Sequence, residues 1–324
     1  MHTNYNIPQW LDSYIFDNLG AVINKNPVKV KRNVNNSHRD NLEYLGTYFP
    51  RTHAEIRTVM NKLHNETNYF QLEEIKNKRS LSILSVGCGT GGEVVGLIDS
   101  LVGIMKITDI SITLADGNRD ALNIASNIVN ARNFEEMLRS KIKVINETIT
   151  ASSGFHRIAG MLSNPKDFDF IITSKLINEL LDQIDNPYSE FVKTFCNHLT
   201  PVGLMIITDT TDRRSNNGSE MFIPQIMNKD INNNILGNLD IGTIMPPPCN
   251  LNFCDNACFT CFKNEYSSRE DDSRFTFRIL AKKLMQNQIS YFVEYNPATY
   301  PVVNTKQGKV DYCKRTEPIS FVPW

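Results

Sequence analysis

Three glycines, at positions 87, 89 and 91, have the spacing of a ligand-binding turn. They stand in the stretch Val86-Gly87-Cys88-Gly89-Thr90-Gly91-Gly92, directly after an apolar run at 81–86. Glycine lets the backbone turn sharply and lets a ligand approach without Cβ atoms in the way. A helix is expected to begin near Gly92 and Glu93, and a glycine turn between a strand and a helix indicates a nucleotide site.

Asp116 is a second candidate binding residue, at the end of the next apolar run and 25 residues after Gly91. Its carboxylate can accept hydrogen bonds from both ribose hydroxyls of an adenosine ligand, and this spacing also suits NAD. The turn lacks the Gly-x-Gly-x-x-Gly frame that sets a helix against pyrophosphate, so a ligand without phosphates is favoured. The predicted ligand-binding residues are Gly87, Cys88, Gly89, Gly91, Asp116, Gly117 and Ser174.

Cysteines form the other group that could do chemistry. Four of the seven cysteines lie between Cys249 and Cys261, a distribution too uneven for a secreted disulfide scaffold. Four thiolates can hold tetrahedral zinc or an iron–sulfur cluster, and spacing alone does not decide between these metals. Unpaired loop thiols are the alternative without a metal, although such thiols are easily oxidised. Cys88 and Cys196 are typical of buried small apolar residues.

The hydrophobic pattern predicts the strands and helices that position these residues. Short apolar runs alternate with helix-length stretches, at 81–86, 112–115, 142–145, 168–173 and 203–208. This alternation predicts an α/β fold with a parallel sheet and right-handed crossovers. Alternating patterns at 275–279 and 289–293 predict an antiparallel pair that closes the sheet.

Four segments are expected along the chain. They are a helical N-terminal extension at 1–78, the sheet core at 79–210, a polar cysteine-rich insert at 211–272 and closing strands at 273–324. In the first segment, a helix is expected to open at Pro50 and Thr52. A long polar segment such as the insert would be disordered unless something pins it, and a metal held by the cysteines would order it.

The composition is that of a soluble globular protein. The chain has 324 residues and a formal net charge of −1, and no apolar run approaches the roughly 18 residues that would span a bilayer. No signal or transit-peptide pattern opens the chain, so a cytoplasmic location without membrane contact is expected. The stretch from Lys25 to Arg32 could contact phosphates or be a solvated loop.

Residues 81–210 resemble the class I methyltransferases that depend on S-adenosylmethionine (SAM). The resemblance rests on the glycine turn, the acidic strand end at Asp116, and the runs Asp167-Phe168-Asp169-Phe170-Ile171-Ile172 and Pro201-Val202-Gly203-Leu204. It implies a Rossmann-like sheet, SAM as the cofactor and methyl transfer as the reaction. One position departs from the family pattern, because Ser85 stands where an acidic residue usually lies two places before the first glycine. The family's contact to the methionine moiety is therefore not carried over at Ser85.

Longer stretches are similar to a narrower family, the mitochondrial small-ribosomal-subunit methyltransferase-like proteins and their bacterial relatives. The matching stretches are Tyr44-Leu45-Gly46-Thr47-Tyr48-Phe49-Pro50-Arg51-Thr52-His53-Ala54-Glu55-Ile56-Arg57, Ile171-Ile172-Thr173-Ser174-Lys175-Leu176-Ile177-Asn178-Glu179-Leu180, Pro248-Cys249 and Gln307-Gly308-Lys309-Val310-Asp311-Tyr312-Cys313. The resemblance implies a 4Fe-4S iron–sulfur cluster held by Cys249, Cys254, one of Cys258 or Cys261, and Cys313. A closed site of the first four cysteines would instead favour zinc.

Candidate catalytic residues follow the run at 168–173, where this fold presents its substrate. They are Ser174, Asn178 and Glu179. Glu179 could accept a proton or orient an amine, although Asn178 and Glu179 could also serve only to cap a helix. Methyl transfer depends mainly on a nucleophile aligned about 3–3.5 Å from the methyl carbon. Asp209 is a further pocket candidate, in a stretch where relatives tend to have Glu-Pro-Gly.

Two classes of function remain open at this stage. The first is an enzyme that methylates RNA of the small ribosomal subunit or, if the chain has been recruited elsewhere, a small molecule. The second is a ribosome-assembly factor that binds SAM and a metal without turnover.

Overall fold

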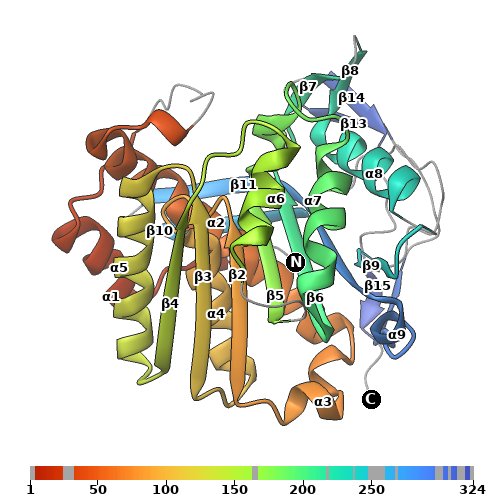
Figure 1. Ribbon diagram of the computed structural model, residues 1–324, viewed down its shortest axis with the longest axis horizontal. Helices are drawn as coiled ribbons and strands as arrows, with labels where there is room; N and C mark the ends of the chain where they lie inside the picture. The colour runs from red at the N-terminus through yellow and green to blue at the C-terminus, as the bar shows by residue number, and fades with distance from the viewer. Residues whose placement is uncertain are drawn as a thin grey trace.

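The architecture is a mixed β-sheet with helices on both faces (Figure 1). The computed structural model describes residues 4–24, 33–162, 167–216, 219–235, 238–246, 260–266, 269–295, 302–305, 308–311 and 318–321. The strands of the main sheet are β1 (Asn4–Asn6), β2 (Ser80–Val86), β3 (Asp109–Asp116), β4 (Arg139–Asn146), β5 (Phe168–Ser174), β6 (Leu199–Asp209), β9 (Ile241–Met245), β10 (Thr260–Tyr266) and β11 (Arg269–Lys282). Their order is β1-β10-β11-β6-β5-β2-β3-β4, with β9 also paired to β11.

Strands β4, β3, β2, β5 and β6 run parallel to one another, as the apolar runs predict. Within this parallel part, the first strand along the chain is the central strand β2, followed outward by β3 and β4. The chain then returns and adds β5 and β6 on the other side of β2. The order of strands therefore reverses between β2 and β5. A ligand crevice forms at such a point, outside the carboxyl ends of the strands.

The closing antiparallel pair is only half as predicted. The run at 275–279 lies in β11, which is antiparallel to β6, but its other partners are β10 and β9 and not the run at 289–293. Consecutive strands are the usual neighbours in a sheet, and β10 directly precedes β11 in the chain. The run at 289–293 instead meets the end of helix α2, where Phe292 N donates to Glu66 O at 2.9 Å. The prediction for 289–293 is wrong because its alternating residues pack on the N-terminal segment.

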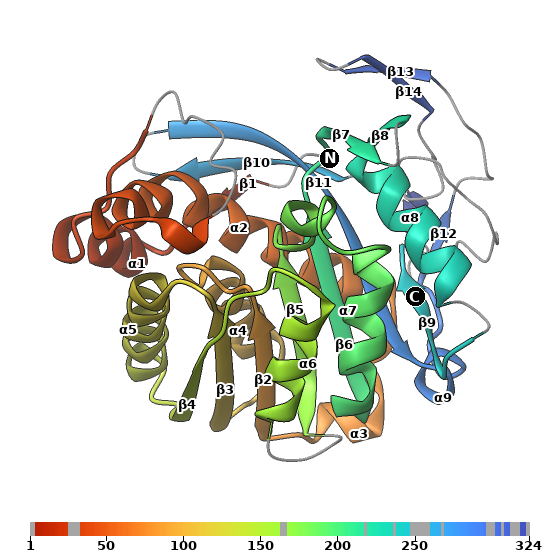
Figure 2. The ribbon, with the colours of Figure 1, turned by 45° about the horizontal axis from the view of Figure 1, so that its top comes forward.

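Helix α2 (His38–Glu66) dominates the N-terminal region, which also contains α1 (Gln9–Ser13) and α3 (Glu73–Lys76). Ser37 caps α2 in a capping box, accepting from Asp40 N while the Asp40 carboxylate accepts from Ser37 N. The predicted helix start at Pro50 and Thr52 is therefore wrong. The helix is capped at Ser37, well before Pro50, and Pro50 lies inside the helix. Figure 2 shows α1 and α2 gathered at one end of the parallel strands.

Two glycines bring α2 against α4 (Gly92–Ile104). A Cβ atom on Gly96 would lie 2.5 Å from His53 O, and one on Gly92 would lie 2.7 Å from Phe49 O. Both distances are far below van der Waals contact, so the helices can approach this closely only with glycine at these positions. The close approach holds the first half of α2 beside the glycine turn.

Helices α2, α4 and α5 (Arg119–Glu135) share one apolar core on one face of the sheet. Helices α6 (Ser152–Gly160), α7 (Pro187–Phe195) and α8 (Ile223–Asn234) share the core of the opposite face (Figures 1 and 2). The smaller elements are β7 (Arg213–Asn216), β8 (Ser219–Phe222), α9 (Lys283–Gln286), β12 (Val293–Tyr295), β13 (Val302–Thr305), β14 (Gly308–Asp311) and β15 (Pro318–Phe321). No helix among the described residues has the length and apolar character needed to cross a membrane.

The segment from 211 to 272, expected to be a polar insert, contains regular structure in its described parts. Helix α8 and strands β7 to β10 belong to it, and β9 and β10 join the main sheet. Helix α8 has an apolar face that packs into the core between the sheet and α7, so this part needs no metal to be ordered. Of the predicted metal ligands, Cys249, Cys254, Cys258 and Cys313 lie outside the described residues, and Cys261 lies in β10.

A buried ionic network ties α2, α4 and α5 together. His53 Nε2 lies 2.6 Å from Asp99 Oδ2, and Arg132 Nε donates to the other Asp99 oxygen. Burial raises the pKa of Asp99, but the hydrogen bond and charge of His53 together with the charge of Arg132 outweigh burial and lower it. Asp99 therefore stabilises the fold in its ionised form.

We expect Asp99→Asn to lower the free energy of unfolding by about 3 kcal/mol, because a buried ion pair that loses one partner leaves the other charge uncompensated. Urea unfolding at pH 7 measures the loss. The control is Asp109→Asn, which breaks an exposed ion pair with Arg139 and should change stability far less. Because the folded-state pKa of Asp99 is lowered, its contribution is present above the ordinary aspartate pKa and fades as the pH falls below it. Equal losses in the two variants would contradict the structural role of Asp99.

Candidate functional site

A cavity opens where the parallel strands end, which is the usual place of a ligand site in such a sheet. Its wall is built almost entirely from residues that directly follow β2, β3, β4 and β5, as expected for the point where the strand order reverses. The lining residues are Val34, Tyr44, Gly87, Gly89, Asp116, Gly117, Glu147, Thr148, Ile149, Thr150, Ser174, Lys175, Leu176, Glu179 and Leu180.

The three glycines of the turn have left-handed backbones and different surroundings. Gly87 has φ of 72°, and a Cβ atom there would lie 2.7 Å from the Leu176 side chain. Gly91 has φ of 86° at the start of α4, where a Cβ atom would lie 3.0 Å from that of Ala125. Gly89 has φ of 49°, and its nearest neighbour would be Tyr44 at 3.7 Å. Gly87 and Gly91 therefore permit close packing, while Gly89 leaves its part of the cavity open.

Asp116 is held in a fixed orientation at the end of β3. Its Oδ2 accepts from Gly89 N and its Oδ1 from Asn118 N, both at 2.8 Å. Burial raises the pKa of Asp116, and these backbone hydrogen bonds counteract the rise. Each carboxylate oxygen has a second lone pair. The geometry thus links the two sequence signals, because the glycine turn and Asp116 meet through a direct hydrogen bond.

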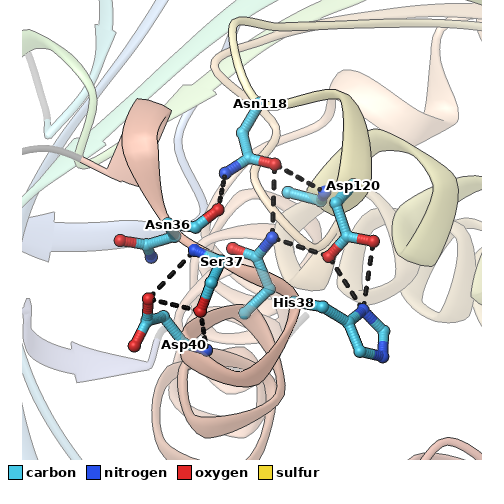
Figure 3. A network of polar contacts seen from close by, with 8 residues as sticks. Asn36, Ser37, His38, Asp40, Asn118 and Asp120 are labelled. Carbon is cyan, nitrogen blue, oxygen red and sulfur yellow. Dashed lines mark hydrogen bonds and ion pairs between the residues drawn. The ribbon is translucent and has the colours of Figure 1, made fainter.

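A polar network ties the N-terminal segment to the start of α5, close to Asp116 and Gly117 in the chain (Figure 3). The Asn118 amide donates to Asn36 O at 3.1 Å and accepts from Asn41 Nδ2 at 3.2 Å. His38 Nδ1 lies 3.0 Å from Asp120 Oδ2, to which Asn41 also donates. The contacts join the start of α2 to the start of α5.

The segment held by this network carries Val34 into the cavity wall beside Gly117. A Cβ atom on Gly117 would lie 2.7 Å from Val34 Cγ2 and 2.9 Å from Thr148 Oγ1. Val34 therefore packs directly on the Gly117 backbone. The end of the cavity next to Asp116 is consequently narrow and partly apolar.

Two of the three predicted catalytic residues line the cavity. Ser174 ends β5, and its Oγ accepts from Thr208 Oγ1 at 2.9 Å. Glu179 lies in the 3₁₀ turn Ile177–Leu180 and also lines the cavity. Asn178 is buried and does not belong to the lining residues, because its amide donates to Lys175 O and to Asp209 Oδ1, both at 2.7 Å.

Asp209 forms a buried brace behind the cavity. It is fully buried and accepts from Asn178 N at 3.1 Å and from Tyr188 OH at 2.8 Å. Burial raises the pKa of Asp209 to about 6, against the effect of these hydrogen bonds. This brace fixes the 3₁₀ turn that carries Glu179. Asp209 and Asn178 therefore affect the cavity by positioning this turn and not by lining the cavity.

Lys175 contributes the positive charge of the wall. Its φ of 58° is left-handed, an unfavourable conformation for a residue other than glycine and one that gathers at functional sites. Lys175 Nζ donates at 2.8 Å to Oε1 of Glu55, a buried residue of α2. The cavity wall next to Ser174 therefore has a cation anchored to the N-terminal helix.

Of the predicted ligand-binding residues, Gly87, Gly89, Asp116, Gly117 and Ser174 line the cavity. Cys88 is buried, as is Cys196, in agreement with their apolar character. Among the described residues, no three His, Cys, Asp or Glu side chains gather as a metal site would require.

Several parts of the wall are absent from the sequence-based prediction. Glu147, Thr148, Ile149 and Thr150 follow β4, and the rule that ligands bind beyond the carboxyl ends of parallel strands points to them. Val34 and Tyr44 carry no such signal, because they reach the cavity through the packing of the N-terminal region.

No family model matches the chain, and none of the curated proteins matches it. Solved structures are similar in fold. A candidate RNA methyltransferase from Pyrococcus horikoshii has 9% identity and a TM-score of 0.41, over 85% of this chain and 99% of that one. A SAM-dependent methyltransferase from Methanosarcina mazei has 14% identity and a TM-score of 0.38, over 65% and 95%. One from Aquifex aeolicus has 14% identity and a TM-score of 0.34, over 70% and 97%.

Proposed function

We propose that this chain is a SAM-dependent methyltransferase whose cofactor lies in the cavity at the ends of β2, β3 and β5. The observation that carries the proposal is the direct hydrogen bond between Gly89 in the glycine turn and Asp116. Both residues line the same cavity. This arrangement fits an adenosine, because the ribose hydroxyls can donate to Asp116 while the glycine backbone allows close approach. Gly117 and Val34 would then contact the adenosine end of the cofactor.

Methyl transfer in this cavity would take place on the side of Ser174 and Glu179. With the ribose at Asp116, Gly87 and Lys175 would line the space for the rest of the cofactor, and Ser174 and Glu179 would form the wall beside its methyl group. The acceptor atom attacks the methyl carbon in line with the departing sulfur, and alignment supplies most of the rate. Glu179 would accept a proton from the acceptor or orient it.

For the acceptor, we propose RNA of the small ribosomal subunit. The support is the resemblance in the stretches at 44–57 and 171–180, which contribute Tyr44 and Lys175 to the same cavity wall. RNA binding would require phosphate contacts, and the stretch from Lys25 to Arg32 considered for this role lies outside the described residues.

The acceptor is tested by incubating the protein and labelled SAM with small ribosomal subunits and, separately, with a metabolite extract. Label in RNA is the expected result. Label in a small molecule would mean that the acceptor is a small molecule and not RNA, as expected if the enzyme has been recruited elsewhere. Cosedimentation with the subunit that falls steeply with salt, without label transfer, would instead indicate a SAM-binding assembly factor.

We also propose that the cysteines hold a metal, with a 4Fe-4S cluster preferred to zinc. The ligands would be Cys249, Cys254, Cys258 or Cys261, and Cys313. Protein purified without oxygen should contain about four iron and four sulfide, a stoichiometry that follows from the cluster. Cys249→Ser should release the metal, whereas Cys196→Ser, which alters a thiol buried elsewhere, should not. Zinc without sulfide would correct the metal, and protein without either would contradict the site.

A further inference from the structure

A buried carboxyl group lies beneath the glycine turn, where strand β2 meets helix α4. Glu93 stands in the first turn of α4 and is only 3% exposed, and Ser85 on β2 is fully buried. Ser85 Oγ donates to Glu93 Oε1 at 2.7 Å. The small serine on the strand thus leaves room for a longer acid that comes from the helix.

Charges in the cavity wall act on this carboxyl group. Burial raises the pKa of Glu93 to about 8; the hydrogen bond from Ser85 and the Lys175 charge lower it, while Asp116 raises it. Lys175 and Asp116 both line the cavity, as does Tyr44, whose own pKa is raised by burial and by the charges of Glu179 and Glu93. Glu93 itself is not among the lining residues, but it interacts electrostatically with three residues that do line the cavity, which places its carboxyl group just behind the wall.

Glu93 belongs to a group of three acids and one base that are linked by these interactions. The acids are Glu55, Glu93 and Asp116, and Lys175, the ammonium group in the wall, is already bonded to Glu55. An unpaired carboxylate in a low-dielectric environment is costly, so burial favours the protonated form of Glu93 in the absence of a further cation. The arrangement is suited to a ligand that brings a positive charge to the glycine turn.

SAM has such a charge at its amino-acid end, which carries an α-ammonium and a carboxylate. We propose that Glu93 binds the α-ammonium group of the cofactor, replacing from α4 the acid that Ser85 does not supply from β2. This inference rests on the proposed function, because the ribose position at Asp116 is what directs the amino-acid end toward Gly87 and Lys175. Lys175 lies on the same side of the cavity, where its charge matches the cofactor carboxylate.

The test compares two ligands by calorimetry: S-adenosylhomocysteine, which has the amino-acid end, and 5′-methylthioadenosine, which lacks it. Glu93→Gln preserves the shape of the side chain and an acceptor for Ser85. It should weaken S-adenosylhomocysteine at least tenfold, as expected for a lost charged hydrogen bond, and leave 5′-methylthioadenosine unchanged. Asp116→Asn is the contrast and should weaken both ligands.

Equal weakening of both ligands by Glu93→Gln would mean that Glu93 only supports the turn, and unchanged binding of both would exclude it from the site. Either result overturns the inference while leaving the SAM site in place. Failure of the unaltered protein to bind either ligand would instead overturn the proposed function.

A second measurement uses the unaltered protein and needs no variant. Because Glu93 must ionise to bind the ammonium group, its pKa is lower in the complex than in the free protein, so binding releases a proton below about pH 8. Binding heats measured near pH 7 in buffers of different ionisation enthalpy should show this release with S-adenosylhomocysteine and not with 5′-methylthioadenosine. The second ligand controls for Asp116 at the end of β3, Lys175 directly after β5 and Tyr44 on α2, which interact electrostatically with Glu93. Equal proton release with both ligands, or none, would overturn the role of Glu93.

Discussion

Replacing Asp116 with alanine should weaken SAM binding at least tenfold. Its carboxylate would accept two hydrogen bonds from the ribose hydroxyls, and a hydrogen bond to a charged group contributes about 1.5–3 kcal/mol, whereas about 1.4 kcal/mol already changes affinity tenfold. Calorimetry with SAM and with S-adenosylhomocysteine measures the loss. Both ligands share the ribose, so both should weaken together.

Asp116 also accepts from Gly89 N and Asn118 N, so the alanine variant could lose affinity through a distorted turn. Asp116→Asn reduces the distortion, because asparagine keeps the size of the side chain and an oxygen acceptor for one of the two backbone donors, while it removes the charge and the second acceptor. A matched control is Asp109→Asn, which alters an exposed ion pair at the opposite end of the same strand β3 and leaves the lining residues unchanged. Unchanged affinity in both Asp116 variants would rule out the ribose assignment.

The sequence predicts the part of the site that is made by local chain segments. The glycine turn follows its strand immediately, and Asp116 ends the neighbouring parallel strand, so that hydrophobic runs and spacing are enough to bring the two together. Ser174 and Glu179 are found for the same reason, because they directly follow β5. In each case, the position of a residue at a strand end determines its position in the cavity.

The rest of the site depends on packing between distant segments, which no local pattern encodes. Tyr44 reaches the cavity because Gly92 and Gly96 let α2 approach α4. Asn178 has the sequence position of a catalytic residue, yet the buried Asp209 attracts its amide away from the cavity lining. Glu93 is a further example. Its proposed role follows from the hydrogen bond that the Ser85 hydroxyl on β2 donates to it on α4, and no local sequence pattern indicates this contact.

The sequence-based strand predictions fail where a strand consists mainly of polar residues. β10 contains Lys263, Asn264 and Glu265 and has no apolar alternation of the kind found in β5 or β6, so the pattern at 289–293 is the stronger signal. Pairing with the adjacent β11 nevertheless makes β10 part of the sheet, since a strand near the edge needs fewer apolar residues than a central one. Hydrophobic periodicity therefore locates the buried centre of this sheet better than its margin.

Glu179→Gln should lower the rate of methyl transfer by about 10²- to 10⁴-fold, the usual contribution of a positioned proton acceptor. The affinity for SAM should not change, because Glu179 lines the acceptor side of the cavity, apart from Asp116 and the glycine turn. Single-turnover assays with labelled SAM and the acceptor found in the labelling experiment measure the rate, and calorimetry measures the affinity. Glutamine retains the size of the side chain but loses the negative charge and the ability to take a proton.

The matched control is Asp182→Asn, which removes an exposed acid three residues further along the same segment and should leave the rate unchanged. Asp209→Asn gives an intermediate test, because it loosens the brace behind the turn that carries Glu179 while leaving Glu179 itself intact. We expect Asp209→Asn to slow transfer less than Glu179→Gln, since misalignment alone reduces the rate without removing the proton acceptor. If Glu179→Gln transferred methyl groups at the normal rate, proton acceptance by Glu179 would be excluded, and alignment of the acceptor by the cavity wall would have to account for catalysis.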